Sequence, residues 1–258
     1  RGISSGLKSL DKVITGFQEK KLYIIAGRPS MGKSALGAHM ALMAAMNQKK
    51  VLFASMEMPS KDIVMRMLAN CADLCRNQIR SGLSEEEIGR LIAAKHEEWS
   101  KNIFILDSEN TVSSIRRFAR RMSALREHGL DMIVVDYLQL LKGDSNSQSR
   151  VYEVEEISRR LKEIAREFSV PVIALSQINR EAERREGHKP LLSDLRDSGS
   201  IEQDADVVML LFRGDYYRHD DDHDGMIEVN IAKNREGPTG RCNLKVDLRF
   251  NRFTDPLL

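Results

Sequence analysis

A phosphate-binding loop constrains the fold of this chain more than any other feature of its sequence. The run Gly-Arg-Pro-Ser-Met-Gly-Lys-Ser follows an apolar stretch at residues 22–26, so a buried strand should lead into the loop and a helix should begin near Lys33. The predicted nucleotide-binding residues are Gly27, Arg28, Pro29, Ser30, Met31, Gly32, Lys33 and Ser34. Their backbone N–H groups would surround the phosphates of a nucleoside triphosphate, and Gly27 and Gly32 supply backbone room.

Two side chains of this loop have predicted chemical roles. Lys33 is expected to reach the outer phosphates, and the Ser34 hydroxyl is placed to ligate Mg²⁺ at the start of the helix. The sequence therefore predicts ATP and Mg²⁺ as cofactors. It leaves open which process the ATP drives.

Length and composition are typical of one α/β domain. The chain has 258 residues, of which 41% are hydrophobic, enough for one sizeable core. Its apolar runs all fall short of the roughly 20 residues that span a bilayer, and its N-terminus carries no leader pattern. We therefore expect a soluble protein that is not secreted and does not contact a membrane.

Cysteine usage and net charge narrow the possible sites. Cys71, Cys75 and Cys242 have no second cysteine pair or nearby histidine, which disfavours a disulfide framework and a zinc site and favours a reducing compartment. The formal net charge of +2 is close to neutral. Any binding of nucleic acid must therefore come from local basic patches.

The alternation of apolar and helical patterns predicts a parallel sheet flanked by helices. A helical pattern runs from the loop to about residue 46, and an apolar run at 51–54 completes a β-α-β unit. We expect this crossover to place the 51–54 strand next to the phosphate-loop strand. Further expected strands are 103–106, 132–135, 172–175 and 207–212, alternating with expected helices at 113–127 and 150–168. This alternation is typical of a doubly wound sheet.

Helix ends are also readable from the sequence. Ser60 is expected to cap a helix that runs through Asp73. Ser84 and Glu87 form a capping-box pattern that opens a helix to about Trp99. Both helices have the pattern of amphipathic scaffolding.

The two ends of the chain differ from its middle. Beyond residue 226 the helical patterns stop, and apolar runs predict a C-terminal antiparallel extension with strands at 226–233, 242–248 and 252–254. The chain begins without Met, so we expect a fragment of a longer protein. In this interpretation residues 1–17 are the end of a linker and residues 18–258 form the domain.

Polar residues follow three of the expected strands. Asp136 ends an apolar strand, as does the carboxylate that holds the Mg²⁺ shell beside a phosphate loop. The alternative is a strand-end Asp that caps the next turn, but the phosphate loop upstream favours the metal role. Glu57 could polarise the attacking water or could lie on the surface of a turn. Gln177 could sense the γ-phosphate or could satisfy backbone groups. Position alone leaves the last two alternatives open.

Together these residues resemble the C-terminal ATPase domain of the DnaB-type replicative DNA helicases, hexameric motors of RecA-like fold. The matching segments are 28–34, 55–59, 134–141, 176–180, 193–206 and 232–240. The segment 193–206 is the most specific of them, because generic RecA-like ATPases lack it. The resemblance implies a RecA-like P-loop NTPase, with a mostly parallel twisted sheet flanked by helices and the C-terminal antiparallel extension.

The resemblance also implies catalytic roles that spacing cannot supply. Glu57 matches the catalytic glutamate, and Gln177 matches the amide that couples the γ-phosphate to the DNA-binding loops. Lys233 and Arg235 match the pair that reaches into the ATP site of a neighbouring subunit. A cation delivered in this way stabilises charge on the transferring phosphoryl group. The implied catalytic residues are Glu57, Lys33, Gln177, Lys233 and Arg235, with Ser34 and Asp136 at the metal.

Two segments resemble the loops that hold single-stranded DNA in the central channel of the ring, namely 180–185 and 196–199. Arg196, Asp197 and Gly199 match the contacting positions. Cations and backbone N–H groups bind phosphates without regard to base sequence, as a motor requires. Asp197 stands where the family often has Glu and is one methylene shorter.

The family resemblance implies a function and a set of partners. The chain would hydrolyse ATP at the subunit interfaces of a homo-hexamer, translocate 5′ to 3′ on single-stranded DNA and unwind duplex DNA during replication. Implied partners are a primase, a helicase loader and other replisome components. The expected location is cytoplasmic, with a bacterial nucleoid, a phage-infected host and an organelle matrix left open.

Two other functions remain as alternatives. The first is a RecA-like recombination or repair ATPase, which shares the phosphate loop, the metal-shell Asp and the catalytic Glu. The second is a regulatory ATP-binding oligomer that does not hydrolyse ATP. The intact catalytic set argues against the second alternative.

Two charged stretches have simpler interpretations. Asp220, Asp222 and Asp224 imitate the start of a calcium loop, but Ile231 stands where a bidentate Glu is required, so we expect an acidic loop without calcium. Four arginines within 116–121 would form one cationic helix face. This face is either solvated or an interface with a subunit or DNA.

Overall fold

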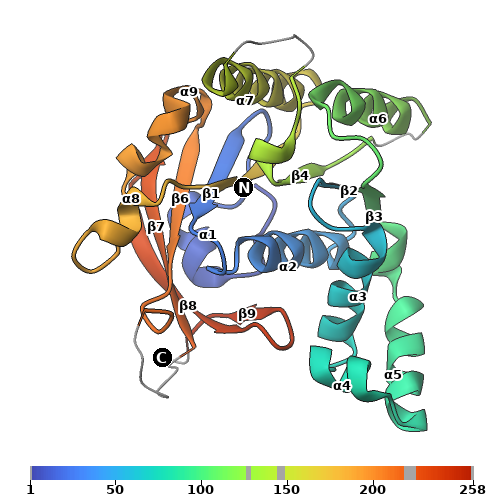
Figure 1. The fold of residues 1–258 in the computed structure, drawn as a ribbon. Coiled ribbons are helices and arrows are strands. Elements are labelled where there is room, and N and C mark those ends of the chain that lie inside the picture. The colour runs from blue at the N-terminus through green and yellow to red at the C-terminus, as the bar shows by residue number, and fades with distance from the viewer. Residues whose placement is uncertain (1, 126–128, 144–148, 218–224, 257–258) are drawn as a thin grey trace.

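A nine-stranded sheet organises the part of the chain that the structure describes (Figure 1). The computed structural model describes residues 2–125, 129–143, 149–217 and 225–256. The strands lie in the order β3-β2-β4-β5-β1-β6-β7-β8-β9. Their bounds are β1 Leu22–Gly27, β2 Val51–Ser55, β3 Ile103–Leu106, β4 Met132–Asp136, β5 Val172–Gln177, β6 Val207–Phe212, β7 Met226–Asn234, β8 Gly240–Asp247 and β9 Arg252–Thr254. β1 to β6 pair in parallel and β7 to β9 continue the sheet in antiparallel fashion, which confirms the predicted fold class.

Helices cover both faces of the parallel part. They are α1 Lys8–Ile14, α2 Lys33–Met46, α3 Ser60–Cys71, α4 Arg76–Ser81, α5 Glu85–Lys95, α6 Val112–Leu125, α7 Arg150–Glu167, α8 Glu181–Arg184 and α9 Gly199–Asp204, with 3₁₀ turns η1 Glu98–Lys101, η2 Leu138–Leu140 and η3 Leu192–Ser198. Figure 1 shows α6 and α7 on one face and α1 and α2 on the other. The hairpin of α3, α4 and α5 extends from the α2 side.

Burial explains why the central strands are almost continuously apolar. All six positions of β1 are buried. Tyr23 and Ile25 pack in the core on the α2 face, whereas Leu22 and Ile24 pack in the core on the α7 face. A strand covered on both faces needs apolar side chains in both directions, and this is the normal pattern of parallel sheets.

The predicted neighbour of the phosphate-loop strand is wrong. β1 pairs with β5 and β6, and β4 and β5 lie between β1 and β2. A β-α-β crossover fixes the parallel direction and the handedness of the connection, but not the number of strands that it passes over. The position of Glu57 therefore needs another explanation, which the functional site provides.

The capping-box prediction is confirmed at α5. The Ser84 hydroxyl accepts from the Glu87 N–H at 3.3 Å, and the Ser84 N–H donates to Glu87 Oε2 at 2.8 Å. The helix ends at Lys95, and Trp99 lies in η1 with its indole N–H donating to the Ala94 carbonyl at 3.0 Å. The expected helix to Trp99 is therefore one 3₁₀ turn too long.

The start of α3 differs from the prediction. Ser60 is the first helical residue and Pro59 is the N-cap, because proline fits the entrance of a helix and lacks the N–H that would need a partner. The Ser60 N–H donates instead to Asp107 Oδ2 at 2.6 Å. The helix ends at Cys71 and is followed by the short α4, which no sequence pattern predicted.

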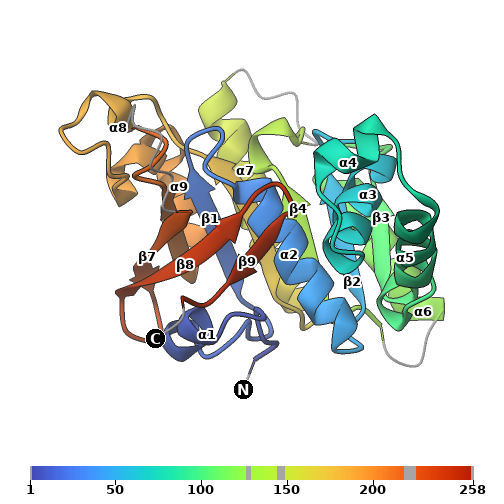
Figure 2. The ribbon, with the colours of Figure 1, turned by 90° about the horizontal axis from the view of Figure 1, so that it is seen from below.

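Residues 2–17 pack against the same core as the rest of the chain (Figure 2). Leu10 and Phe17 are completely or almost completely buried. The first turn of α1 is held by a residue near the other end of the chain, because the N–H groups of Lys8 and Ser9 both donate to the Asp255 carboxylate at 2.8 Å. The strand β8 lies beside α1 in Figure 2.

The cationic face of α6 is engaged within the chain. Arg116 and Arg120 both form ion pairs with Glu167 of α7, and Arg117 pairs with Glu109. The acidic stretch 220–224 lies outside the described residues. Among the described helices, none combines the length and the apolar character needed to cross a membrane.

Candidate nucleotide-binding site

The carboxyl ends of parallel strands and the N-terminus of α2 surround a cavity of about 590 Å³. Ligands of open α/β sheets bind at this edge, where the strands end. The lining residues are Pro29, Ser30, Gly32, Lys33, Ser34, Ala35, Glu57, Arg66, Asp136, Tyr137, Gln177, Leu248 and Asn251. Side chains predicted to act on nucleotide and metal from different segments therefore meet in one cavity.

The loop itself has the geometry of a phosphate cradle. Gly32 is the N-cap of α2 with a φ of 90°, a left-handed conformation that favours glycine. The N-terminus of α2 faces the cavity and favours an anion there. Gly27 ends β1, and the Met31 side chain is buried in the core at 1% exposure. Gly27 and Met31 therefore connect the loop to the sheet and to the core, away from the cavity.

Lys33 lies in the cavity and is not paired with a carboxylate in the described chain. Its ammonium donates to the Arg28 carbonyl at 2.8 Å. Burial lowers the pKa of Lys33 to about 8, against the attraction of Asp136. An incoming phosphate would replace the carbonyl as partner and favour the charged form.

Asp136 and Ser34 form the best-defined candidate for a cation site. The Ser34 hydroxyl donates to Asp136 Oδ1 at 3.1 Å. Asp136 is 1% exposed, and its Oδ2 is buried without a hydrogen-bond partner in the described chain. Burial raises the pKa of Asp136 to about 6. An orphaned buried carboxylate oxygen beside a hydroxyl fits a hard cation such as Mg²⁺, which prefers oxygen ligands.

Glu57 reaches the cavity through β4 and not through β1. It follows β2, whose last residue Ser55 pairs with Asp136 at the end of β4. The Met56 N–H then donates to the Asp136 carbonyl at 2.7 Å. This bond holds the turn after β2 beside Asp136, and Glu57 lines the same cavity as Asp136.

Gln177 stands at the end of β5, and a second glutamine fixes its backbone. The Gln139 side chain accepts from the Gln177 N–H at 3.1 Å and donates to the Gln177 carbonyl at 2.9 Å. It also donates to the Ser176 hydroxyl at 2.9 Å. Gln139 had no predicted role, although it falls in the matching segment 134–141.

Arg66, Leu248 and Asn251 also line the cavity and were not anticipated. Arg66 comes from α3 and the other two from the turn between β8 and β9. No local sequence signal marks them, because tertiary packing alone carries the β8–β9 turn to the phosphate loop.

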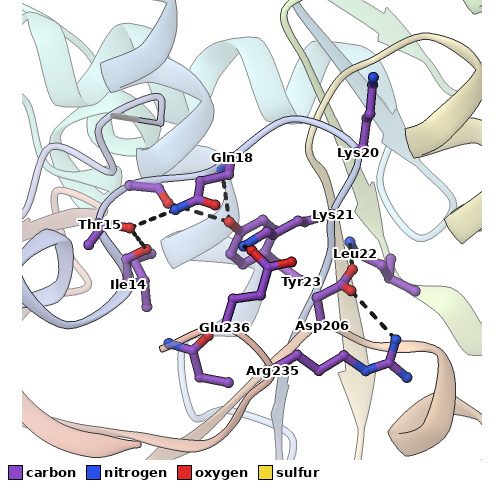
Figure 3. Close-up of polar contacts among 12 residues, drawn as sticks. Ile14, Thr15, Gln18, Lys20, Lys21, Leu22, Tyr23, Asp206, Arg235 and Glu236 are labelled. Carbon is purple, nitrogen blue, oxygen red and sulfur yellow. Dashed lines mark hydrogen bonds and ion pairs between the residues drawn. The ribbon is translucent and has the colours of Figure 1, made fainter. Parts of the chain in front are cut away.

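Lys233 and Arg235 lie away from this cavity, at the end of β7. Lys233 donates to the Glu202 carbonyl. Arg235 donates to the Gln203 carbonyl, and its guanidinium lies 3.7 Å from the Asp206 carboxylate. Figure 3 shows Arg235 and Asp206 together at the start of β1, where the Leu22 N–H donates to Asp206 at 2.7 Å. The structure therefore does not bring these two cations to the phosphate loop of their own chain.

The remaining predicted residues fall in two places. The Arg28 backbone belongs to the loop, but its side chain lines a different cavity, on the other side of Gln177. The DNA-contact candidates lie at the junction of two elements: Arg196 and Asp197 belong to η3, and Gly199 begins α9. Their side chains are outside the described part of the structure.

A family comparison decides the assignment of the chain. The sequence model of the DnaB-like helicase C terminal domain matches residues 2–255. The chain belongs to the DnaB-like helicase C-terminal domain family. A solved structure described as an ATPase domain agrees, with 35% identity, a TM-score of 0.94 and coverage of 100% of this chain and 92% of the other.

The chain spans a little more than half the length of the curated relatives that it matches. It is 43% identical over 258 residues to the replicative DNA helicase DnaB of Geobacillus stearothermophilus, covering 98% of the chain and 56% of the relative. A similar match to the DnaB of Haemophilus influenzae covers 55% of that relative. The RadB recombinase has a TM-score of 0.61 at 19% identity over 99% of the chain and 100% of the other, which shows a shared fold alone.

Proposed function

We propose that this chain is the ATP-driven motor domain of a replicative DNA helicase. It would hydrolyse ATP with Mg²⁺ at the subunit interfaces of a homo-hexamer, move 5′ to 3′ on single-stranded DNA and unwind duplex DNA during replication. The single observation that carries the proposal is the cavity in which Lys33, Glu57 and the orphaned Asp136 oxygen meet. The family membership supports the choice of helicase over a recombination ATPase.

In this proposal one subunit supplies the phosphate loop, the metal ligands and the base. The loop N–H groups and Lys33 hold the outer phosphates, and Glu57 accepts a proton from the attacking water. Ser34 and Asp136 would hold Mg²⁺, which neutralises phosphate charge. Gln177 reports the γ-phosphate to the neighbouring loops.

The neighbouring subunit supplies Lys233 and Arg235. Their distance from the phosphate loop of their own chain supports a role in trans, since a guanidinium needs to touch the transferring group to stabilise its charge. The ATPase would then require an assembled ring. Hydrolysis by a dispersed subunit would be slow, and this dependence separates the motor from an ATPase whose site is complete in one chain.

The nucleic-acid side of the proposal uses segments 180–185 and 196–199. Arg196, Asp197 and Gly199 would contact phosphates of single-stranded DNA. A solved DnaB-like replicative helicase, described with its interactions with primase, is 35% identical to this chain with a TM-score of 0.93 and covers 100% of this chain and 64% of the other. This similarity supports a primase as partner, and a helicase loader and replisome components are proposed with it in a cytoplasmic setting.

The testing experiment is the ATPase rate against protein concentration, with and without single-stranded DNA, at low and moderate salt. We expect the rate per subunit to rise with concentration and to be stimulated by DNA. The measurement is made on this chain and on the full-length protein. A flat rate that ignores DNA in both proteins would overturn the proposal, and tight ATP binding without turnover would favour the regulatory oligomer.

A further inference from the structure

The side chain of Arg28 does not line the cavity of the phosphate loop but a second cavity, together with Ile178 and Arg180. It is 7% exposed. Its Nε donates to Glu183 Oε1 of α8 at 2.8 Å, and one terminal nitrogen donates to the Ile178 carbonyl at 2.8 Å. The guanidinium thus holds the segment after β5 at two points, at its start and in α8.

The backbone of Arg28 is also the hydrogen-bond partner of Lys33. The Lys33 ammonium donates to the Arg28 carbonyl, and the Ile178 N–H donates to the Gly27 carbonyl at 3.4 Å. A continuous series of polar contacts therefore links the Lys33 ammonium, through Arg28, to the segment 178–184. A phosphate that draws Lys33 away would leave the Arg28 carbonyl without this donor.

Glu183 extends the series further. Its backbone carbonyl contacts Nδ1 of His188 at 2.7 Å, and the His188 ring stacks on Tyr217 with centroids 4.4 Å apart. The turn after α8 is therefore anchored to the helix that Arg28 holds.

Energetics make the Arg28 contacts hard to break singly. A guanidinium removed from water is costly unless a carboxylate and other acceptors satisfy it. The planar fork of arginine can serve Glu183 and the Ile178 carbonyl together, whereas the single ammonium of lysine cannot match this geometry. The two contacts should therefore hold or fail as a unit.

We propose that Arg28 and Glu183 are positioning residues that couple the phosphate loop to the single-stranded DNA contact made by the 180–185 segment. The inference rests on the proposed function, in which this segment faces DNA. It adds a connection separate from Gln177, and it gives Arg28 a task other than phosphate binding by its side chain. The coupling acts in both directions, because linkage between two ligands is reciprocal.

The test measures the affinity of a fluorescein-labelled oligothymidylate for the full-length protein, with and without a non-hydrolysable ATP analogue and Mg²⁺. The ratio of the two affinities is the coupling factor, which for linked sites is about 5 to 150. We expect Glu183→Gln to lower this factor at least about fivefold toward 1, while the affinity for the analogue stays within about threefold. Arg28→Lys should likewise lower the coupling factor toward 1, and the double variant should lose no more than either single variant.

The control is Glu167→Gln. It also removes a glutamate that pairs with arginines, but these pairs link α7 to α6, away from the phosphate loop. It should leave the coupling factor within about twofold. Retention of the full factor in both test variants, or loss of analogue affinity with unchanged coupling, would overturn the inference. If the unaltered protein binds no oligothymidylate, the proposed function itself fails. Thermal melts of all variants show whether each is folded.

Discussion

The phosphate cavity and the end of β7 differ in how completely their charged side chains are buried and paired. In the cavity, Asp136 Oδ2 is buried without a hydrogen-bond partner in the described chain, and burial lowers the pKa of Lys33 to about 8. At the end of β7, Lys233 and Arg235 are satisfied by carbonyls of their own chain, and the Arg235 side chain is 45% exposed.

This difference indicates where ligand-binding energy is stored. An unsatisfied buried group costs free energy until a ligand arrives, and in the proposed function the ligand of this cavity is the nucleotide with Mg²⁺. Arg235 is exposed and Lys233 is half-buried, and both have carbonyl partners, so they cost less as they are. In the proposed function they act on a neighbouring subunit. The two regions are thus the two halves of one proposed catalytic site, carried at different places on the same subunit.

The largest expected effect comes from a mutation in one half of the proposed site combined with a mutation in the other half. Arg235→Ala should lower turnover by about 10³-fold or more, since a trans arginine contributes about that much or more to phosphoryl transfer. Mixing it with a Lys33→Ala protein should partly restore the ATPase, because some sites then combine two intact halves. ATPase assays over a series of mixing ratios check this, and a rate that never exceeds the sum of the two variants would contradict the trans assignment.

Replacement of Glu57 tests the other half. Glu57→Gln should lower turnover by about 10²- to 10⁴-fold, as expected when a general base is removed, and should leave ATP binding unchanged. The measurements are steady-state ATPase and the affinity for a fluorescent ATP analogue. Mixing Glu57→Gln with Lys33→Ala should restore nothing, because both changes damage the same half. Recovery in that mixture would place Glu57 outside the half that holds the phosphate loop.

The contact between α2 and β9 predicts a pH effect on stability. His39 of α2 lies with its ring centroid 5.6 Å from that of Phe253 in β9, both ring nitrogens lack partners in the described chain, and burial lowers the pKa of His39 to about 4. The unfolded chain binds the extra proton between pH 6.5 and 4, so stability is lost as the pH falls through this window.

The expected size of this effect is about 2 kcal/mol between pH 7 and pH 5. Urea denaturation at the two pH values measures it in the unaltered protein. His39→Phe keeps an aromatic ring but cannot bind a proton, so its stability should fall by about 2 kcal/mol less over the same interval. Equal losses in the two proteins would show that the titration of His39 does not cause the pH effect.

The smallest expected effect concerns the DNA contact. Arg196→Ala should weaken the binding of single-stranded DNA for all sequences and reduce the slope of log affinity against log salt by about 1. Fluorescence anisotropy at several salt concentrations measures the slope. An unchanged slope would move the proposed DNA path away from η3 and α9.

Much of the parallel core could be predicted because its signals are local. The strand, glycines and helix of the phosphate loop act within a few residues of one another, and the capping box of Ser84 and Glu87 is a local reciprocal contact. The order of the strands is not local. The sequence predicted β2 beside β1, whereas β4 and β5 separate them, and only the packing of the whole sheet determines this order.

The candidate site divides in the same way. Asp136 could be found from its position after an apolar strand beside a phosphate loop, but Glu57 needed the family resemblance because position alone was ambiguous. Arg66 and Asn251 reach the cavity by tertiary packing and carry no local signal. The direction of the Arg28 side chain depends on Glu183, which lies far along the chain.

The contact between Asp255 and the first turn of α1 has a consequence for synthesis of the protein. The N–H groups of Lys8 and Ser9 find their acceptor in a residue that the ribosome adds 246 or more positions later. During translation, these two N–H groups of α1 lack this acceptor until Asp255 has emerged from the ribosome. Loss of Asp255 would therefore remove the acceptor of these N–H groups and favour fraying of α1, which lies far away in the sequence.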